Sequence, residues 1–254
     1  VRQAMRDEEA FITASIQLPP QTNEVRRAAV LIGAGHWLSA RFGLPLALSE
    51  LGASGGLNLG FDRFALTAQG ARFGAAESPV RLSPYWRGDL PPATPFAVVE
   101  RRGVDLNPLD PTTPAGRLRL MAFLWADQPE RLALTRAAMA LATEAPDRAD
   151  GIDWLEARLA EGPIPGACHM VYTTVAWQYF PPEAQARGAA LIAAAGARAT
   201  TDAPLAWVAM EADASGPGAA LTVTVWPSGE VYDLGRADFH GRWIDWAVTE
   251  RHVA

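Results

Sequence analysis

The chain has 254 residues, of which 49% are hydrophobic, so it is long and apolar enough for one large domain with a substantial core. Its formal net charge of −6 argues against nonspecific binding to nucleic acids, because a protein that holds the phosphate backbone needs a basic face. The chain contains arginine but no lysine, which excludes mechanisms that depend on lysine, such as P-loop phosphate binding and Schiff-base catalysis.

The cysteine and histidine content limits the redox and metal chemistry. Cys168 is the only cysteine, so an intrachain disulfide is impossible and a cysteine-based zinc site is not expected. The histidines show no metal-ligand spacing, and we expect no bound metal. No apolar run is long enough to span a membrane and the first residues do not resemble a signal peptide. We therefore expect a cytoplasmic protein with no membrane partner.

Prolines near residue 20 divide the chain into two unequal parts. Residues 1–20 are expected to be the remnant of a helical region, and since the chain begins with Val1 we expect an upstream segment to be missing. Residues 21–254 are expected to form one α/β domain. Residues 64–95 are rich in glycine, proline, serine and aromatic residues without sustained periodicity, which indicates an insertion with short antiparallel strands.

Within the domain, helix and strand patterns alternate. Predicted helices cover 25–42, 130–143, 153–159 and 182–196, with another beginning over 57–63, and predicted strands cover 46–51, 96–105, 167–176 and 205–210. Two short runs at 221–226 and 230–234, separated by a Pro-Ser-Gly turn, predict a hairpin. This order indicates a mostly parallel sheet with an antiparallel edge, in which strand 46–51 is central and parallel to strand 96–105.

The most informative stretch is the loop after the first predicted strand. Glu50, Gly52, Ser54 and Gly56 follow an acid-x-Gly-x-Ser-x-Gly spacing, and the small residues let a ligand approach the backbone, with free N–H groups at the start of the next helix. The spacing resembles the first motif of class I S-adenosylmethionine-dependent methyltransferases, in which a glycine stands at the position of Ser54. The resemblance implies that these residues, together with Asn58, bind the cofactor.

Two other interpretations of this loop remain open. The segment 52–58 also resembles the glycine-rich loop of short-chain dehydrogenases, but those enzymes need a Tyr-x-x-x-Lys pair and this chain has no lysine. Alternatively, the glycines serve only the packing of a helix against a strand, since isolated glycine motifs recur by accident.

Several short sequence segments along the chain resemble those of one bacterial family. They are QTNEV at 21–25, ELGASGGLNL at 50–59, RGVDLNP at 102–108, WADQ at 125–128 with Arg131, and HG at 240–241 with Trp246. Together they resemble the uncharacterised family known as domain of unknown function 2332. The resemblance implies a Rossmann-like sheet of the class I methyltransferase type, mostly parallel with a C-terminal antiparallel hairpin, and it does not supply a reaction.

The end of the second predicted strand is a candidate ribose site. Class I methyltransferases place an acid there on the adenosine ribose, and Asp105 occupies that position, with Leu106 and Asn107 expected near the adenine. A carboxylate is suited to this role because it accepts hydrogen bonds from two vicinal hydroxyls. The alternative is that Asp105 only caps a turn.

Polar residues that precede the first predicted strand are candidates for holding the carboxylate of the cofactor. Thr22, Asn23 and Arg26 offer hydroxyl, amide and guanidinium donors for charge-assisted hydrogen bonds. The alternative is that Thr22 or Asn23 caps the helix at 25–42 and Arg26 is solvated.

Aromatic and imidazole groups are expected on the acceptor side of the site. Tyr172 and Tyr179 belong to the predicted strand 167–176 and the loop after it, where they would orient or shield a methyl acceptor. His240 follows the last predicted strand and is the candidate general base, because it exchanges a proton near neutral pH. The alternative is that the rings belong to the core and the histidine is a structural hydrogen-bond donor.

We therefore expect an S-adenosylmethionine-dependent methyltransferase whose acceptor is a small molecule or another group that the sequence does not identify. Methyl transfer needs positioning and desolvation of the acceptor more than an acid–base pair, so the absence of a conspicuous catalytic dyad does not argue against it. The alternatives are a binding module of the same fold without turnover, which holds a nucleotide or S-adenosylmethionine, and an NAD(P)-dependent oxidoreductase.

Overall fold

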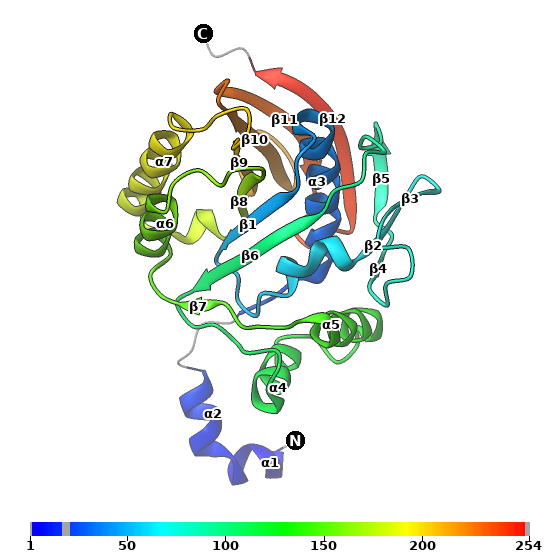
Figure 1. The fold of residues 1–254 in the computed structure, drawn as a ribbon. Coiled ribbons are helices and arrows are strands. Elements are labelled where there is room, and N and C mark those ends of the chain that lie inside the picture. Colours follow the sequence, from blue (N-terminus) through cyan, green and yellow to red (C-terminus); the bar gives the residue numbers. More distant parts are fainter. Residues whose placement is uncertain (1, 17–20, 252–254) are drawn as a thin grey trace.

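The computed structural model describes residues 2–16 and 21–251 (Figure 1). The strands are β1 (Leu46–Leu51), β2 (Ala65–Ala68), β3 (Ala71–Gly74), β4 (Arg81–Leu82), β5 (Tyr85–Gly88), β6 (Val98–Asp105), β7 (Asp147–Arg148), β8 (Cys168–Thr174), β9 (Leu205–Ala212), β10 (Ala219–Trp226), β11 (Glu230–Ala237) and β12 (Trp243–Arg251). The α-helices are α1 (Arg2–Asp7), α2 (Glu9–Ser15), α3 (Ala28–Phe42), α4 (Pro114–Ala122), α5 (Pro129–Leu141), α6 (Gly151–Ala160) and α7 (Pro182–Gly196). Short 3-10 helices are η1 (Val25–Arg27), η2 (Leu57–Arg63) and η3 (Trp177–Tyr179). Each predicted helix and strand has a counterpart here, with boundaries that differ by no more than a few residues.

Nine strands form one sheet in the order β5-β12-β11-β10-β9-β8-β1-β6-β7. The strands from β7 to β9 are parallel, and β1 lies among them between β6 and β8. The strands β9, β10, β11 and β12 are neighbours in the chain and in the sheet, and they pair antiparallel. The prediction of a mostly parallel sheet with an antiparallel edge is confirmed, as is the parallel pairing of β1 with β6.

The antiparallel edge is larger than the predicted hairpin. β12 has no counterpart among the predicted elements, although Ile244 and Trp246 are fully buried while Asp245 between them is not. This period-two burial is the pattern of a half-buried strand. The charged residues of the segment interrupt its apolar character, which is why the pattern is weak in the sequence. The edge is therefore a meander of three consecutive strands after β9.

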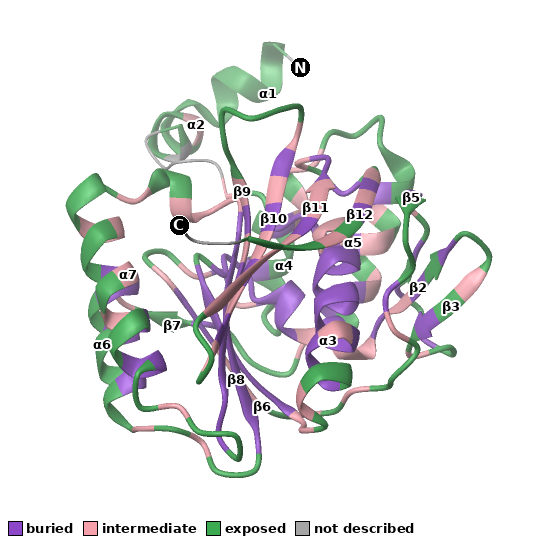
Figure 2. Cartoon of the chain, turned by 90° about the horizontal axis from the view of Figure 1, so that it is seen from above, coloured by how far each residue is buried: buried purple, intermediate pink, exposed green. Residues whose placement is uncertain are grey.

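Helices cover both faces of the sheet (Figure 2). α3 lies on one face, and α6 and α7 lie on the other. Successive side chains of β8 alternate between them: Met170 and Tyr172 belong to the core on the α3 side, and Val171 packs in the core that contains Leu155 of α6 and Ile192 of α7. A parallel strand covered on both faces is buried along its length, and all six residues of β1 are buried.

The segment 64–95, which we predicted to be an insertion, contains the short strands β2 to β5. β2 and β3 form an antiparallel hairpin, whereas β4 pairs with β2 in parallel. β5 is not part of this small sheet. It belongs to the large sheet, where it runs parallel to β12. The backbone N–H of Tyr85 donates to the carbonyl of Arg242 over 2.9 Å, so the insertion is attached next to the β11–β12 turn.

The described part of the N-terminal segment, residues 2–16, contains the short helices α1 and α2, and residues 1 and 17–20 of the predicted helical remnant lie outside the described residues. α1 and α2 lie below the sheet in Figure 1, and none of their described side chains is buried.

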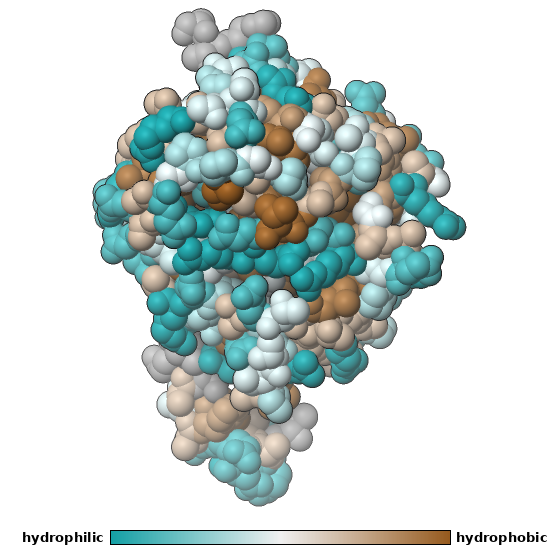
Figure 3. All heavy atoms as spheres, in the orientation of Figure 1, coloured by the Kyte–Doolittle hydropathy of each residue, from teal (hydrophilic) through white to brown (hydrophobic). Residues whose placement is uncertain are grey.

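No helix within residues 2–16 and 21–251 combines the length and hydrophobicity needed to cross a membrane. On the face seen in Figure 3, hydrophilic and neutral residues predominate and the hydrophobic patches are small and separate.

Candidate functional site

A cavity of about 710 Å³ lies at the carboxyl ends of the parallel strands. Its walls come from residues before and within η1, from the loops after β1, β6 and β8, from the start of α6 and from the β11–β12 turn. From β1 the chain builds outward to β6 and β7 in one direction and to β8 and β9 in the other. Ligands of open α/β sheets bind at such a switch in strand order, so this cavity is the candidate site.

The glycine-rich loop at residues 52–57 uses every one of its backbone N–H groups inside the protein. The N–H groups of Gly52 and Ala53 donate to the carbonyl of Val104, both over 3.0 Å, that of Ser54 donates to Asp105 Oδ2 over 2.8 Å, and that of Gly56 donates to the carbonyl of Ala53 over 2.7 Å. Gly55 and Leu57 donate to Asn23 Oδ1 over 3.2 and 3.0 Å. The expectation of free N–H groups is therefore wrong for residues 52–57, because Asn23 accepts from the N–H of Leu57, the first residue of the next helix.

The backbone of this loop explains why small residues stand there. Gly52, Ser54 and Gly56 have φ angles of 71°, 55° and 66°, in the left-handed region that favours glycine. Ser54 therefore adopts a backbone conformation that glycine takes more readily than serine. Its Oγ is buried and has no hydrogen-bond partner among the described residues. Gly52 and Ser54 line the cavity, whereas Gly56 does not.

Asp105 lies on one wall of the cavity, and its carboxylate accepts three hydrogen bonds. Its Oδ1 accepts from Gln21 Nε2 over 2.8 Å and from the Asn107 backbone over 2.9 Å, and its Oδ2 accepts from Ser54. The bond to Asn107 is the turn cap considered above, so Asp105 has this role and faces the cavity as well. Gln21 also lines the cavity, and its Oε1 is buried without a partner among the described residues.

Arg27 is a site residue that the sequence did not single out. Its Nη1 donates to the carbonyl of Thr174 and its Nε to that of Phe239, each over 2.8 Å, which holds the guanidinium against the cavity. It forms no ion pair with a described residue, and burial lowers its pKa while Glu24 opposes the shift. The neighbouring Arg26, which was the candidate, does not line this cavity. Two adjacent arginines at the start of a helix offer no pattern that tells which one faces inward.

Three of the expected site residues lie in the core and not at the cavity. Glu50 is 2% exposed, and burial raises its pKa to about 8. The hydroxyl of Tyr172 donates to Glu50 Oε2 over 3.4 Å, and burial raises the pKa of this hydroxyl too. Asn58 is also buried, and its Nδ2 donates to the carbonyl of Glu24 over 3.3 Å. Tyr172 therefore does not form part of an acceptor wall, because its side chain faces the α3 side of the sheet.

The remaining expected residues divide between the cavity and its surroundings. Thr22, Leu106, Tyr179 and His240 line it. Asn107 does not, and its Oδ1 accepts from Arg148 Nη1 over 3.2 Å. The helix cap predicted for Thr22 or Asn23 is provided by another residue, since Glu24 Oε1 accepts from the backbone of Arg26 at the start of η1.

His240 stands at the junction of two cavities. It lines the first one together with Gly52 and Ser54, and it lines a second cavity of about 520 Å³ together with Arg26. Its ring makes no hydrogen bond to a described residue, and burial is the main cause of its lowered pKa. The lowered pKa favours the neutral imidazole, which has an acceptor nitrogen available.

Comparison with known proteins gives a family and no function. A family model described as "Uncharacterized protein conserved in bacteria (DUF2332)" matches residues 1–246. No curated protein and no solved structure matches the chain.

Proposed function

Because this chain belongs to the DUF2332 family of uncharacterised bacterial proteins, its site must be interpreted from geometry, and we propose that it binds S-adenosylmethionine and transfers the methyl group to a small acceptor. The observation that carries the proposal has two parts. The N–H groups of the glycine-rich loop all have acceptors inside the protein, and this loop, Asp105 and Arg27 line one cavity. Each of these features favours one part of the ligand.

The loop favours a ligand without phosphates. A dinucleotide is held by its pyrophosphate, which binds to free N–H groups of the glycine-rich loop and the following helix. All N–H groups of residues 52–57 already have acceptors inside the protein, and the following helix η2 is short and capped by Asn23. S-adenosylmethionine has no phosphate and needs only close approach to such a loop. This argument also disfavours the NAD(P)-dependent oxidoreductase.

Asp105 and Gln21 suit the ribose. The Asp105 carboxylate accepts three hydrogen bonds, and because a carboxylate offers about four acceptor positions, one remains. Gln21 Oε1 is a second acceptor without a partner among the described residues. Together they would accept from the two vicinal hydroxyls of an adenosine ribose.

Arg27 suits the carboxylate of the methionine part. It is bonded to the end of β8, whereas Asp105 ends β6, so β1 separates them in the sheet. Two strand spacings correspond to roughly 10 Å, which an S-adenosyl ligand spans between its ribose and its carboxylate. A guanidinium binds a carboxylate through charge-assisted hydrogen bonds.

His240 is the proposed general base. When bound, the cofactor supplies an activated methyl group. The sulfonium sulfur would keep the electron pair of the carbon–sulfur bond as the methyl group passed to an acceptor heteroatom. His240 would accept the proton that the acceptor loses, on its free imidazole nitrogen. Phe180 and Phe239 are partly buried, line the same cavity and would exclude water from the acceptor, whereas Tyr179 lines the cavity but is 74% exposed.

Calorimetry with two related ligands tests the proposal. S-adenosylhomocysteine carries the amino-acid carboxylate, and 5′-methylthioadenosine lacks it. Arg27→Gln should weaken binding of S-adenosylhomocysteine by about tenfold or more, the range for a hydrogen bond to a charged group, and leave binding of methylthioadenosine unchanged. Arg72→Gln, an exposed change on β3, is the matched control.

The outcomes separate the alternatives. Preference of the wild-type protein for NAD over both ligands, or no binding of either, would overturn the proposal. If Arg26→Gln and not Arg27→Gln lowers the affinity, the carboxylate site is wrong. Binding without methyl transfer to any tested acceptor would favour the binding module.

A further inference from the structure

A polar groove continues from the candidate site beyond His240. The second cavity shares His240 with the first, and a third cavity of about 450 Å³ shares Arg26, Glu130 and Arg242 with the second. The groove is lined by four arginines: Arg26, Arg81, Arg131 and Arg242. In a chain with a net charge of −6, this local concentration of guanidinium groups stands out.

Backbone contacts bring three of these arginines together from distant parts of the chain. Gly241 packs against Arg26 so closely that a Cβ on Gly241 would lie 2.6 Å from the Arg26 carbonyl oxygen. The next residue, Arg242, is bonded through its carbonyl to the N–H of Tyr85, which places the segment of Arg81 alongside. Tertiary contacts therefore hold these like charges together in spite of their mutual repulsion.

Two of these arginines are neutralised by the protein. Arg131 pairs with buried Glu24, with 2.6 Å between Nε and Oε2. Arg242 Nη2 pairs with Asp238 Oδ2 at 2.7 Å.

The other two arginines have little or no compensation. Arg26 Nη2 lies 3.9 Å from a carboxylate oxygen of Glu130, whose side chain is 91% exposed. Such a solvated pair contributes little. Arg81 forms no ion pair with any residue in the described ranges. The remaining carboxylate of the lining, Asp127, is exposed, so solvent screens it more strongly than the partly buried Arg26.

The N-terminal end of α5 opens into the same groove. Its cap residue, Gln128, makes no side-chain cap bond, and Pro129 has no N–H. Within the described chain, the backbone N–H groups of Glu130 and Arg131 have no acceptor. Open N–H groups and the positive end of a 13-residue helix attract an anion.

We infer that this groove binds an anionic group, a carboxylate or a phosphate, of the small molecule that receives the methyl group. The inference rests on the proposed function in one respect, namely that the ligand of this groove is the acceptor. Its anion would lie on Arg26 and Arg81 beside the start of α5, and its reactive atom would reach His240, which faces both cavities.

Anion titrations of the protein without cofactor test the groove separately from the proposed function. Inorganic phosphate and malonate are titrated at constant ionic strength, and binding is followed by NMR of the arginine Nε–Hε groups and of the His240 ring. We expect one of the two anions to bind saturably, with shifts confined to His240 and the groove. Arg26→Gln and Arg81→Gln should each weaken that binding by about tenfold. Arg72→Gln should leave it unchanged.

The two probes also identify the chemistry of the ligand. Tighter binding of malonate indicates a carboxylate acceptor, and tighter binding of phosphate indicates a phosphorylated one. Shifts spread evenly over surface arginines, or equal losses in the groove variants and Arg72→Gln, would overturn the inference. Because no cofactor is present, these results do not depend on whether S-adenosylmethionine binds.

Discussion

Gly52 and Ala176 lie so close together that a Cβ on Gly52 would be 2.6 Å from the Cβ of Ala176. Gly52 belongs to the loop after β1, and Ala176 follows β8, so the contact joins the two loops on either side of the switch in strand order. Both residues line the candidate cavity. The width of the cavity therefore depends on the absence of a side chain at residue 52.

Gly52→Ala is expected to damage both stability and ligand binding. The φ angle of 71° costs a non-glycine residue about 1–2 kcal/mol, and the contact with Ala176 forces the two loops apart. Urea unfolding and calorimetry with S-adenosylhomocysteine measure the two effects. Gly70→Ala is a control for the backbone cost, because residue 70 also has a positive φ but has open space around it. Equal binding by both variants and the wild type would show that the contact does not shape the site.

Glu50→Gln is expected to change how stability depends on pH. Burial raises the pKa of Glu50 from 4.5 to about 8, so the folded chain keeps a proton that the unfolded chain releases. The contribution of Glu50 to stability is therefore present below about pH 4.5 and is lost as the pH rises through about 8. Glutamine resembles the protonated carboxyl and still accepts from Tyr172, so the variant should lose less stability between about pH 5 and pH 8.

Chemical denaturation at a series of pH values checks this prediction. His169 contributes in the opposite direction, because burial lowers its pKa to about 3 and its contribution is lost as the pH falls below 6.5. The contribution of His169 is common to the wild type and the variant. The difference between their free energies of unfolding therefore reports the contribution of Glu50 alone. A difference that does not change with pH would contradict the assignment of a buried, protonated Glu50.

Cys168 is expected to be inert in the folded protein. It is fully buried at the start of β8, and burial raises its pKa to about 12, so the reactive thiolate is scarce. A thiol reagent at about pH 8 should modify the chain in denaturant and spare it in native buffer. Because this is the only cysteine, mass spectrometry of the intact chain measures the modified fraction directly. Rapid labelling of the native protein would show that β8 opens locally.

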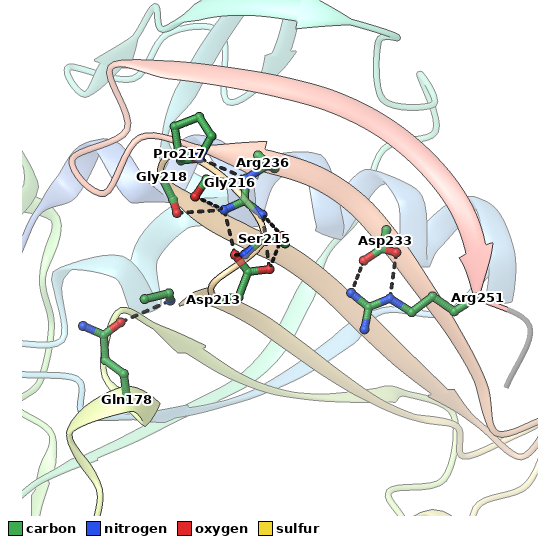
Figure 4. A network of polar contacts seen from close by, with 10 residues as sticks. Gln178, Asp213, Ser215, Gly216, Pro217, Gly218, Asp233, Arg236 and Arg251 are labelled. Carbon is green, nitrogen blue, oxygen red and sulfur yellow. Dashed lines mark hydrogen bonds and ion pairs between the residues drawn. The ribbon is translucent and has the colours of Figure 1, made fainter.

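Arg236 of β11 fastens the loop between β9 and β10 (Figure 4). Its guanidinium donates to the carbonyls of residues 216, 217 and 218 over 2.9, 2.9 and 3.0 Å, and it pairs with Asp213 at 2.8 Å. Arg236→Met should lower the free energy of unfolding by about 1.5–3 kcal/mol, since several acceptors lose a charged donor.

A second arginine in the same view is the control for that variant. Arg251 pairs with Asp233 near the end of β12, and its side chain is 50% exposed (Figure 4). Arg251→Met should cost only about 0–1 kcal/mol, as is usual for a solvated pair. Urea unfolding of both variants measures the difference. Equal losses would show that the loop contacts of Arg236 add nothing to its ion pair.

The sequence by itself determined the order of the elements and the edge of the sheet where the site lies. Local patterns carry this information: the apolar run of β1, the proline and glutamate that open α7, and the Pro-Ser-Gly turn between β10 and β11 depend on neighbours in the chain. The loop at 52–57 and Asp105 were also recognisable, because small residues and acids at strand ends are local signals. Since parallel strands all end at the same edge of a sheet, the parallel sheet brings this loop and Asp105 together at the cavity.

Only the tertiary structure decided which side chains face the cavity and what their polar groups already bind. Arg27 and not Arg26 reaches it, because carbonyls of residues 174 and 239 hold its guanidinium there. The N–H groups of the loop are used by Asn23, Val104 and Asp105, which no local pattern pairs with the loop. Tyr172 lies in the core since β8 alternates its side chains between two covered faces. Hydrogen bonds between distant segments depend on orientation within a few degrees and tenths of an ångström, and one-dimensional patterns do not contain that information.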